Sequence, residues 1–155
     1  MAKLRSIIII LVFLLIFSPS LSTAVEKPGN RDRCPVCGMF VAPYPSWLAT
    51  IAFNDGSQLF FDGPKDLFRF YLDWPAKESR QKSDITAIYV TEYYSTRLMK
   101  IAEVLFVTGS DVYGPMGQEL VPVAGREAAA GFMRDHRGTK IITFEQVSKF
   151  ELPAQ

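Results

Sequence analysis

The first half of the chain alternates short apolar runs with turn residues. Residues 47–53 are apolar and partly β-branched, residues 54–56 read Asn-Asp-Gly, and residues 57–61 are a second apolar run. This order predicts a β-hairpin. Gly-Pro then opens a segment, residues 64–74, in which apolar residues recur at helical spacing, and a proline ends it. A polar link leads to a predicted strand at residues 85–90.

The second half repeats this order with different residues. It predicts a strand at 101–107, a short strand at 119–123, a helix at 127–137 that Gly138 ends, and a strand at 140–147. Strand, strand, helix, strand therefore occurs twice, which predicts an α+β fold of two structurally related ββαβ units, residues 47–95 and 96–150. Each unit is too small to bury its apolar face alone, so we expect the two to pack into one compact body.

The N-terminal residues 1–24 have the pattern of an export signal. Lys3 and Arg5 are followed by an unbroken apolar run at residues 7–17 and by the small residues Ser-Thr-Ala at 22–24. The apolar run is about half of the roughly 20 residues that span a membrane, which favours cleavage over a permanent anchor. No cysteine follows the small residues, so lipidation is not predicted. We expect a periplasmic or otherwise extracytoplasmic protein, associated with a membrane only if this segment is retained.

Charge and motifs exclude several functions. The chain has 17 basic and 16 acidic residues, a balance that offers no electrostatic attraction for nucleic acid. Its two cysteines are too few for a disulfide framework, so apolar packing must hold the fold. The sequence has no Ser-His-Asp order, phosphate-binding loop or close carboxylate pair, and we therefore do not expect a hydrolase or a phosphoryl transferase.

Residues 25–46 form a polar leader and the segment CPVCGM, which contains Cys34, Cys37 and Met39. A disulfide between the cysteines would close a loop of only four residues and contribute about 2 kcal/mol. A redox pair would favour a helix N-terminus, but a predicted strand follows here. A closed zinc site typically has four cysteine or histidine ligands, and the chain offers at most two cysteines and one histidine, so zinc is possible but undersupplied. Copper(I) accepts few, soft ligands, so a copper site is favoured and a redox pair remains the alternative.

Met116 and His136 are further candidate ligands. Met116 lies in the turn GPMG rather than in a periodic run, so it is as well explained by a metal ligand as by packing under a loop. Met133, inside the second predicted helix, is better explained as a core residue. His136, the lone histidine, ends that helix, where interaction with the last carbonyl groups is the more common role. Asp62 is first of all a helix-entry residue and only a remote candidate.

Several motifs together resemble one family. CPVCGMFV, LFFDGPKDLFRFYLD, GPMGQELVPV and FMRDHRGTKIITFEQV occur in this order over most of the chain and are similar to the NosL family, accessory copper proteins of nitrous oxide reductase. The resemblance implies an extracytoplasmic Cu(I) metallochaperone, not an enzyme, with a fold similar to part of organomercurial lyase. Its candidate ligands are Cys34, Cys37, Met39, Met116 and His136.

The resemblance also implies partners, and the sequence departs from the related patterns at two points. The implied partner is a copper-dependent reductase or a membrane transporter complex that accepts or donates copper. NosL proteins typically carry an N-terminal lipid-bearing cysteine, which this chain lacks in that position. The opening also resembles small YHS and TRASH metal-binding modules, in which further cysteines follow an aromatic strand, whereas Asp62 stands near that position here. An exported thiol-disulfide protein using the CxxC pair is the alternative function, and a non-catalytic partner subunit is a third.

Overall fold

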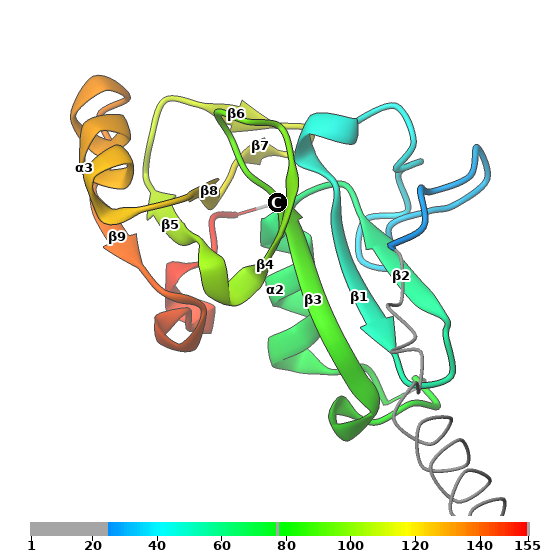
Figure 1. The fold of residues 1–155 in the computed structure, drawn as a ribbon. Helices are drawn as coiled ribbons and strands as arrows, with labels where there is room; N and C mark the ends of the chain where they lie inside the picture. Colours follow the sequence, from blue (N-terminus) through cyan, green and yellow to red (C-terminus); the bar gives the residue numbers. More distant parts are fainter. Residues whose placement is uncertain (1–24, 77, 155) are drawn as a thin grey trace, which may run out of the picture.

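The computed structural model describes residues 25–76 and 78–154. Within them, two α-helices and three antiparallel sheets form an α+β fold (Figure 1). The helices and strands in chain order are β1 (Ala49–Phe53), β2 (Gln58–Phe61), α2 (Pro64–Asp73), β3 (Ile85–Thr91), β4 (Leu98–Lys100), β5 (Leu105–Thr108), β6 (Tyr113–Gly114), β7 (Gly117–Gln118), β8 (Val121–Val123), α3 (Arg126–Asp135) and β9 (Lys140–Ile142). None of the helices in these residues has the length and apolar character that crossing a membrane requires.

The predicted hairpin is confirmed. Strands β1 and β2 pair antiparallel, with Ala49 opposite Phe61, and the turn between them contains Gly56 at a φ of 83°, which a residue with a Cβ rarely adopts. Strand β1 also pairs with β3, so it lies inside a sheet of order β2-β1-β3-β4 and all five of its residues are buried. Burial on both faces explains why its sequence is an almost continuous apolar run.

Helix α2 begins and ends where the sequence predicts. Pro64 occupies its first turn, where the missing N–H costs nothing, and the helix ends at Asp73, just before Trp74-Pro75. One face carries buried aromatic and aliphatic residues, among them Leu67 and Phe68. Two polar residues of the first turns, Lys65 and Asp66, are buried as well. This end of the helix therefore needs polar partners, and they belong to the candidate site described below.

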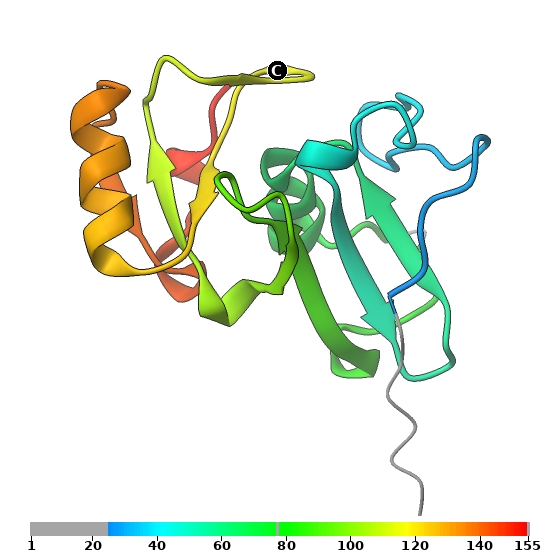
Figure 2. The same cartoon turned by 45° about the horizontal axis from the view of Figure 1, so that its top comes forward.

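The second half has a comparable strand order. Strand β5 lies between β8 and β9, just as β1 lies between β2 and β3, and α3 connects β8 to β9 as α2 connects β2 to β3. The short hairpin of β6 and β7 is inserted between β5 and β8. Its turn is the predicted turn at Pro115 and Met116. The C-terminal segment, drawn in red, runs up to this hairpin (Figure 2), and Nζ of Lys65 donates to the carbonyls of both Met116 and Ala154.

Four predicted strands differ from the structure by two or more residues at one end. The segment predicted at 119–123 is a strand only over Val121–Val123. Residues 45–47 are a 3-10 turn, so the first strand starts at Ala49. Ile101–Glu103 is a 3-10 turn, and β5 starts only at Leu105. The last strand ends at Ile142 rather than at residue 147, because Thr143 and Gln146 cap a 3-10 turn there. Strand β4 was not predicted. Apolar residues in these turns still face the core, which shows that apolar character alone does not distinguish a strand from a buried turn.

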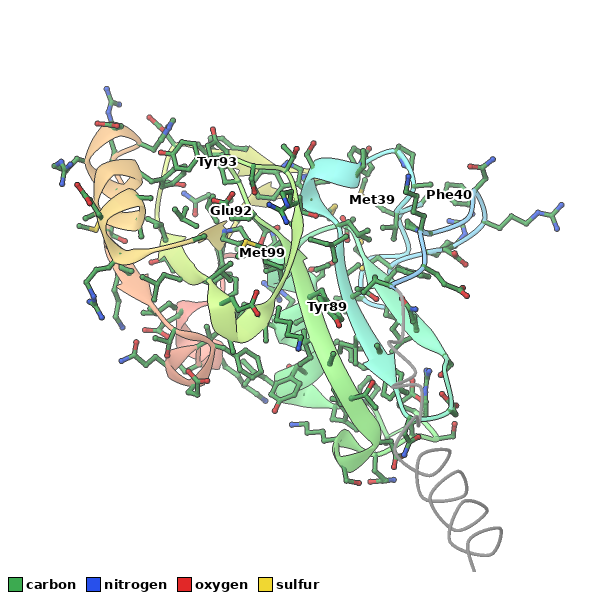
Figure 3. All side chains as sticks on the ribbon, viewed as in Figure 1. Met39, Phe40, Tyr89, Glu92, Tyr93 and Met99 are labelled. Carbon is green, nitrogen blue, oxygen red and sulfur yellow. The ribbon has the colours of Figure 1, made fainter. Side chains whose placement is uncertain are left out.

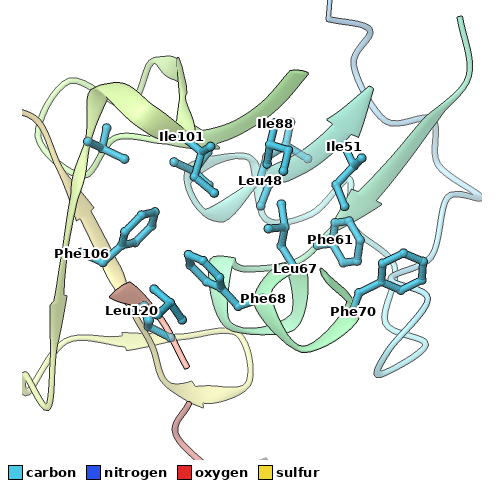
Figure 4. Packing of buried hydrophobic residues seen from close by; sticks show 14 of the residues in the cluster. Leu48, Ile51, Phe61, Leu67, Phe68, Phe70, Ile88, Ile101, Phe106 and Leu120 are labelled. Atoms are coloured by element: carbon cyan, nitrogen blue, oxygen red, sulfur yellow. The ribbon is translucent and has the colours of Figure 1, made fainter. Parts of the chain in front are cut away.

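The larger hydrophobic core contains residues of both halves (Figure 4). Phe68 of α2 contacts Phe106 of β5 edge to face, with ring centroids 5.0 Å apart. Leu120 and Ile142 from the second half belong to the same cluster. A smaller cluster lies around Phe132 of α3, and the partly buried Met133 packs against it, in agreement with a packing role. The sequence division at residues 25–46, 47–95 and 96–150 stays a prediction, and the predicted signal segment, residues 1–24, lies outside the described residues.

Candidate metal centre

The cysteine segment is a tight loop that turns both thiols inward. An isolated bridge joins Arg33 to Phe40, the Cys34 amide donates to the carbonyl of Met39 (2.8 Å), and the Gly38 amide donates to the carbonyl of Cys34 (2.9 Å). Gly38 has a φ of 79°, so this sharp reversal depends on a glycine. The Arg33 guanidinium lies 3.8 Å from the centre of the Phe40 ring and bonds to the Gly38 carbonyl. Backbone hydrogen bonds inside the loop and the contacts of the Arg33 side chain therefore both stabilise its conformation.

Two carboxylates at the start of α2 face the two thiols. The Cys34 thiol donates to Oδ2 of Asp66 and the Cys37 thiol donates to Oδ1 of Asp62, each over 3.3 Å. Asp62 precedes the extended N-cap residue Gly63 and Asp66 lies in the first turn of α2, and both carboxylates face the cysteine loop. One ligand atom from each of the four residues lies within 4.8 Å of the other three. This set has the dimensions of a metal centre.

Burial controls the protonation of the thiols. Cys34 is 1% exposed and Cys37 is partly buried, and neither forms a disulfide. Loss of hydration raises the pKa of Cys34 far above its ordinary value, and it raises the pKa of Cys37 to about 11; the adjacent carboxylates add to both shifts. Both thiols are protonated at neutral pH. A thiol-disulfide catalyst needs the opposite shift, because the thiolate is the nucleophile.

One carboxylate oxygen in this set has no partner. Asp66 is 2% exposed, and its Oδ1 is buried without a hydrogen bond in the described residues. A buried carboxylate oxygen without a donor is costly, and such atoms are rare in folded proteins. The structure thus leaves an unmet requirement for positive charge or a donor beside Cys34.

The site opens to solvent beside Cys37. A pocket of about 400 Å³ is lined there by Arg33, Cys37, Gly38, Met39, Phe40, Pro43 and Tyr44. Met39 and Phe40, which belong to the loop, lie on the opposite side of the molecule from Tyr93 (Figure 3). Phe40 is 42% exposed, so its ring is available to solvent at the rim. A ligand can therefore approach Cys37 and Met39 from outside, whereas Cys34 is closed off.

Met116 lies against the same end of α2. Its carbonyl oxygen accepts a hydrogen bond of 2.6 Å from Nζ of Lys65, the residue next to Asp66, and the same ammonium group donates to the carbonyl of Ala154 over 3.2 Å. Lys65 of α2 thus forms hydrogen bonds with both the β6–β7 turn and the C-terminal segment, and the same helix carries Asp66. Met116 itself is partly exposed.

Glu119 completes the link between the hairpin and the helix. Its Oε1 accepts the backbone N–H groups of Lys65 (2.5 Å) and Leu120 (3.0 Å), so it satisfies one of the unpaired amides at the start of α2. Complete burial raises the pKa of Glu119 to about 8. Gly63 leaves room for this carboxyl group, because a Cβ at position 63 would lie 2.2 Å from Oε2 of Glu119 and one of the two would have to shift. Sequence analysis did not identify Lys65 or Glu119.

His136 is in a different environment. It caps the C-terminus of α3, its Nδ1 lies 3.3 Å from Oδ1 of Asp111, and its ring centroid is 4.4 Å from that of Phe132. Figure 1 shows α3 on one side of the molecule and the cysteine loop, drawn in blue, on the other. The structure therefore brings Cys34, Cys37 and Met39 together in one loop, with Met116 at the same end of α2, and does not bring His136 to them.

The two aspartates were missed or undervalued by sequence analysis. Asp62 was assigned to helix entry, and Asp66 was not considered. The only signal for them in the sequence is that two aspartates stand close together at a predicted helix start, where carboxylates are common as capping residues. The resemblance to YHS and TRASH modules places Asp62 near a position where those modules have a thiol, but no feature of the sequence places Asp66 beside the cysteine loop.

Comparisons with known proteins agree on one family. The sequence model of the NosL family matches residues 25–152. Among solved structures, the copper chaperone NosL from Shewanella denitrificans has a TM-score of 0.69 at 19% identity, over 83% of this chain and 98% of that one. The apo-NosL protein from Achromobacter cycloclastes has a TM-score of 0.46 at 22% identity, over 67% and 87%. No curated protein matches the sequence.

Proposed function

This chain belongs to the NosL family, and from that membership we propose that it is a Cu(I) metallochaperone for a copper-dependent reductase such as nitrous oxide reductase. The observation that carries the proposal is the pair of thiols in one loop, with Cys34 buried and Cys37 partly exposed to a pocket. Thiolate sulfur is a preferred ligand of Cu(I). The Shewanella protein of the same fold is described as a copper chaperone.

The proposed copper ligands are Cys34, Cys37 and Met39 of the loop, with Met116 from the hairpin turn. The two thiol sulfurs lie within 4.8 Å of each other, and Met39 lines the pocket beside Cys37. Copper binding displaces the thiol protons that now bond to the carboxylates, since only the thiolate is a ligand. His136, paired with Asp111 at the end of α3, stays a prediction as a ligand. A His136→Gln variant with reduced Cu(I) affinity would support it.

Delivery by ligand exchange fits the unequal exposure of the two thiols. Cys37 is reachable from the pocket while Cys34 is enclosed, so a ligand of the acceptor can attack copper on one side before the inner thiolate releases it. We further propose that the acceptor or donor is the reductase or a membrane transporter complex. The protein would act outside the cytoplasm after removal of residues 1–24.

The repeated strand order also supports a duplicated fold as part of this proposal. Two related ββαβ units, with the copper loop preceding the first and the Met116 hairpin inserted into the second, would place the proposed ligands near one end of α2, where Lys65 donates to the Met116 carbonyl. Superposition of residues 47–95 on residues 96–150 tests the relation directly.

An anaerobic Cu(I) titration against a competing chelator tests the function. We expect one tightly bound Cu(I) per chain and its loss in a Cys34→Ser/Cys37→Ser double variant that keeps the far-UV circular dichroism spectrum of the parent. Unchanged Cu(I) affinity in that variant would refute the proposal. The alternative, an exported thiol-disulfide protein, predicts instead a disulfide between the cysteines that cycles with a thiol buffer, and the raised thiol pKa values oppose it.

A further inference from the structure

The thiol-carboxylate group contains more ligands than Cu(I) requires. Cu(I) is satisfied by a few soft ligands, and carboxylate oxygen is a hard ligand that suits divalent ions. Yet Asp62 and Asp66 are 1% and 2% exposed and face the two thiols directly. Carboxylates are rarely buried without a partner of opposite charge. Their presence inside the site indicates that a second class of metal ion, one that binds carboxylate oxygen, can also occupy it.

The dimensions match tetrahedral coordination by two sulfurs and two oxygens. In a zinc site with Zn–S of about 2.3 Å and Zn–O of about 2.1 Å, neighbouring ligand atoms are about 3.4 to 3.8 Å apart. The two thiol-carboxylate distances here are 3.3 Å, and all four ligand atoms lie within 4.8 Å of one another. A contraction of about 1 Å in the longest separations would close the site.

The unpartnered oxygen of Asp66 is an independent observation that points to a cation. Oδ2 of Asp66 accepts the Cys34 thiol, while Oδ1 is buried with no donor in the described part of the chain. A bound cation would satisfy that oxygen. It would also neutralise charge, because two thiolates and two carboxylates carry four negative charges, which a divalent ion compensates better than a monovalent one in a low-dielectric interior.

We propose that Cys34, Cys37, Asp62 and Asp66 form a four-ligand site for a borderline divalent cation of the zinc class. Soft thiolates and hard carboxylates together suit zinc, whereas magnesium and calcium prefer oxygen ligands throughout. The site uses both cysteines, so a divalent ion and Cu(I) compete for it; this competition, unlike the divalent site itself, rests on the proposed copper function. Zinc would then occupy the thiols until copper displaces it.

Cobalt(II) is the spectroscopic probe and zinc the competitor. Anaerobic titration of the purified chain with Co(II) should give one equivalent with thiolate-to-metal absorption and the visible bands of tetrahedral cobalt, and Zn(II) should remove both. Asp66→Asn and Asp62→Asn should each weaken Zn(II) binding by roughly tenfold or more, since each removes a charged ligand. Both substitutions keep the side-chain volume. Both should change Cu(I) affinity by a smaller factor than Zn(II) affinity, because sulfur holds the copper whereas the carboxylates only face the thiols.

Asp73→Asn is the matched control, because Asp73 lies at the other end of α2 and forms an exposed ion pair with Lys149. It should leave Zn(II) and Cu(I) binding unchanged. Absence of tetrahedral cobalt bands in the parent protein would overturn the proposal without any variant. Equal Zn(II) affinity in the parent and both aspartate variants would overturn it too. So would an equal loss of Zn(II) and Cu(I) affinity in those variants.

The two proposals fail in different ways. If the parent chain binds Cu(I) but neither Co(II) nor Zn(II), the divalent site is overturned and the copper function stands. If it binds Zn(II) through the aspartates but not Cu(I), the divalent site is supported and the copper function is overturned.

Discussion

Removing the buried ammonium group of Lys65 should destabilise the protein strongly. Lys65 is 0% exposed, and its Nζ donates to the carbonyl groups of Met116 and Ala154. Lys65→Met keeps most of the apolar stem but leaves both carbonyl oxygens without this donor. The hairpin turn and the C-terminal segment then lose their common attachment to α2.

The size of the effect follows from the number of charged hydrogen bonds. Each bond from a charged donor contributes about 1.5–3 kcal/mol, so the pair contributes about 3–6 kcal/mol. Burial of the more apolar methionine side chain raises the free energy of unfolding by about 1–2 kcal/mol and offsets part of this loss. We therefore expect a loss of about 2–4 kcal/mol, a large part of the roughly 5–15 kcal/mol by which domains are stable.

Urea denaturation followed by circular dichroism measures this loss. Lys149→Met is the control, because Lys149 forms an exposed ion pair with Asp73 whose loss should cost less than about 0.5 kcal/mol. A Lys65→Met variant within about 1 kcal/mol of the parent would refute the reasoning, since the two hydrogen bonds would then contribute no net stability. Under the proposed function, the released Met116 turn should also lower Cu(I) affinity.

Three further predictions concern the same end of the molecule. Burial raises the pKa of Glu119 from 4.5 to about 8, so the folded state keeps a proton that the unfolded state loses, and stability should fall between these pH values by up to about 1.4 kcal/mol per pH unit. Glu119→Gln should remove this slope, measured by urea denaturation at pH 5 to 8; equal slopes would contradict the assignment. Met116→Leu should lower Cu(I) affinity and leave stability within about 1.5 kcal/mol of the parent, with Met133→Leu as the core control whose Cu(I) affinity is unchanged. Gly63→Ala should cost about 1–3 kcal/mol in thermal or urea unfolding, because the new Cβ meets the enclosed Glu119 carboxylate; a neutral result would show that Glu119 can move away.

Local signals predicted most of the secondary structure. The Asn-Asp-Gly turn, the proline that opens α2 and the glycine after α3 act through the backbone conformation of their own residues, so they can be read without a partner. They located both helices and the hairpin correctly. Strand bounds were less accurate: Ile101 is buried in a 3-10 turn, and β4 pairs with β3 although its own pattern is weak.

The sequence by itself determined the cysteine loop, because Cys34, Cys37 and Gly38 are close along the chain and the glycine allows the reversal. It also identified the family. Only the tertiary structure decided what faces the thiols. Their carboxylate partners lie 32 and 25 residues away in sequence, and Lys65 and Met116 are 51 residues apart. Such pairings depend on how α2 packs against the loop and the hairpin, and no local pattern encodes that packing.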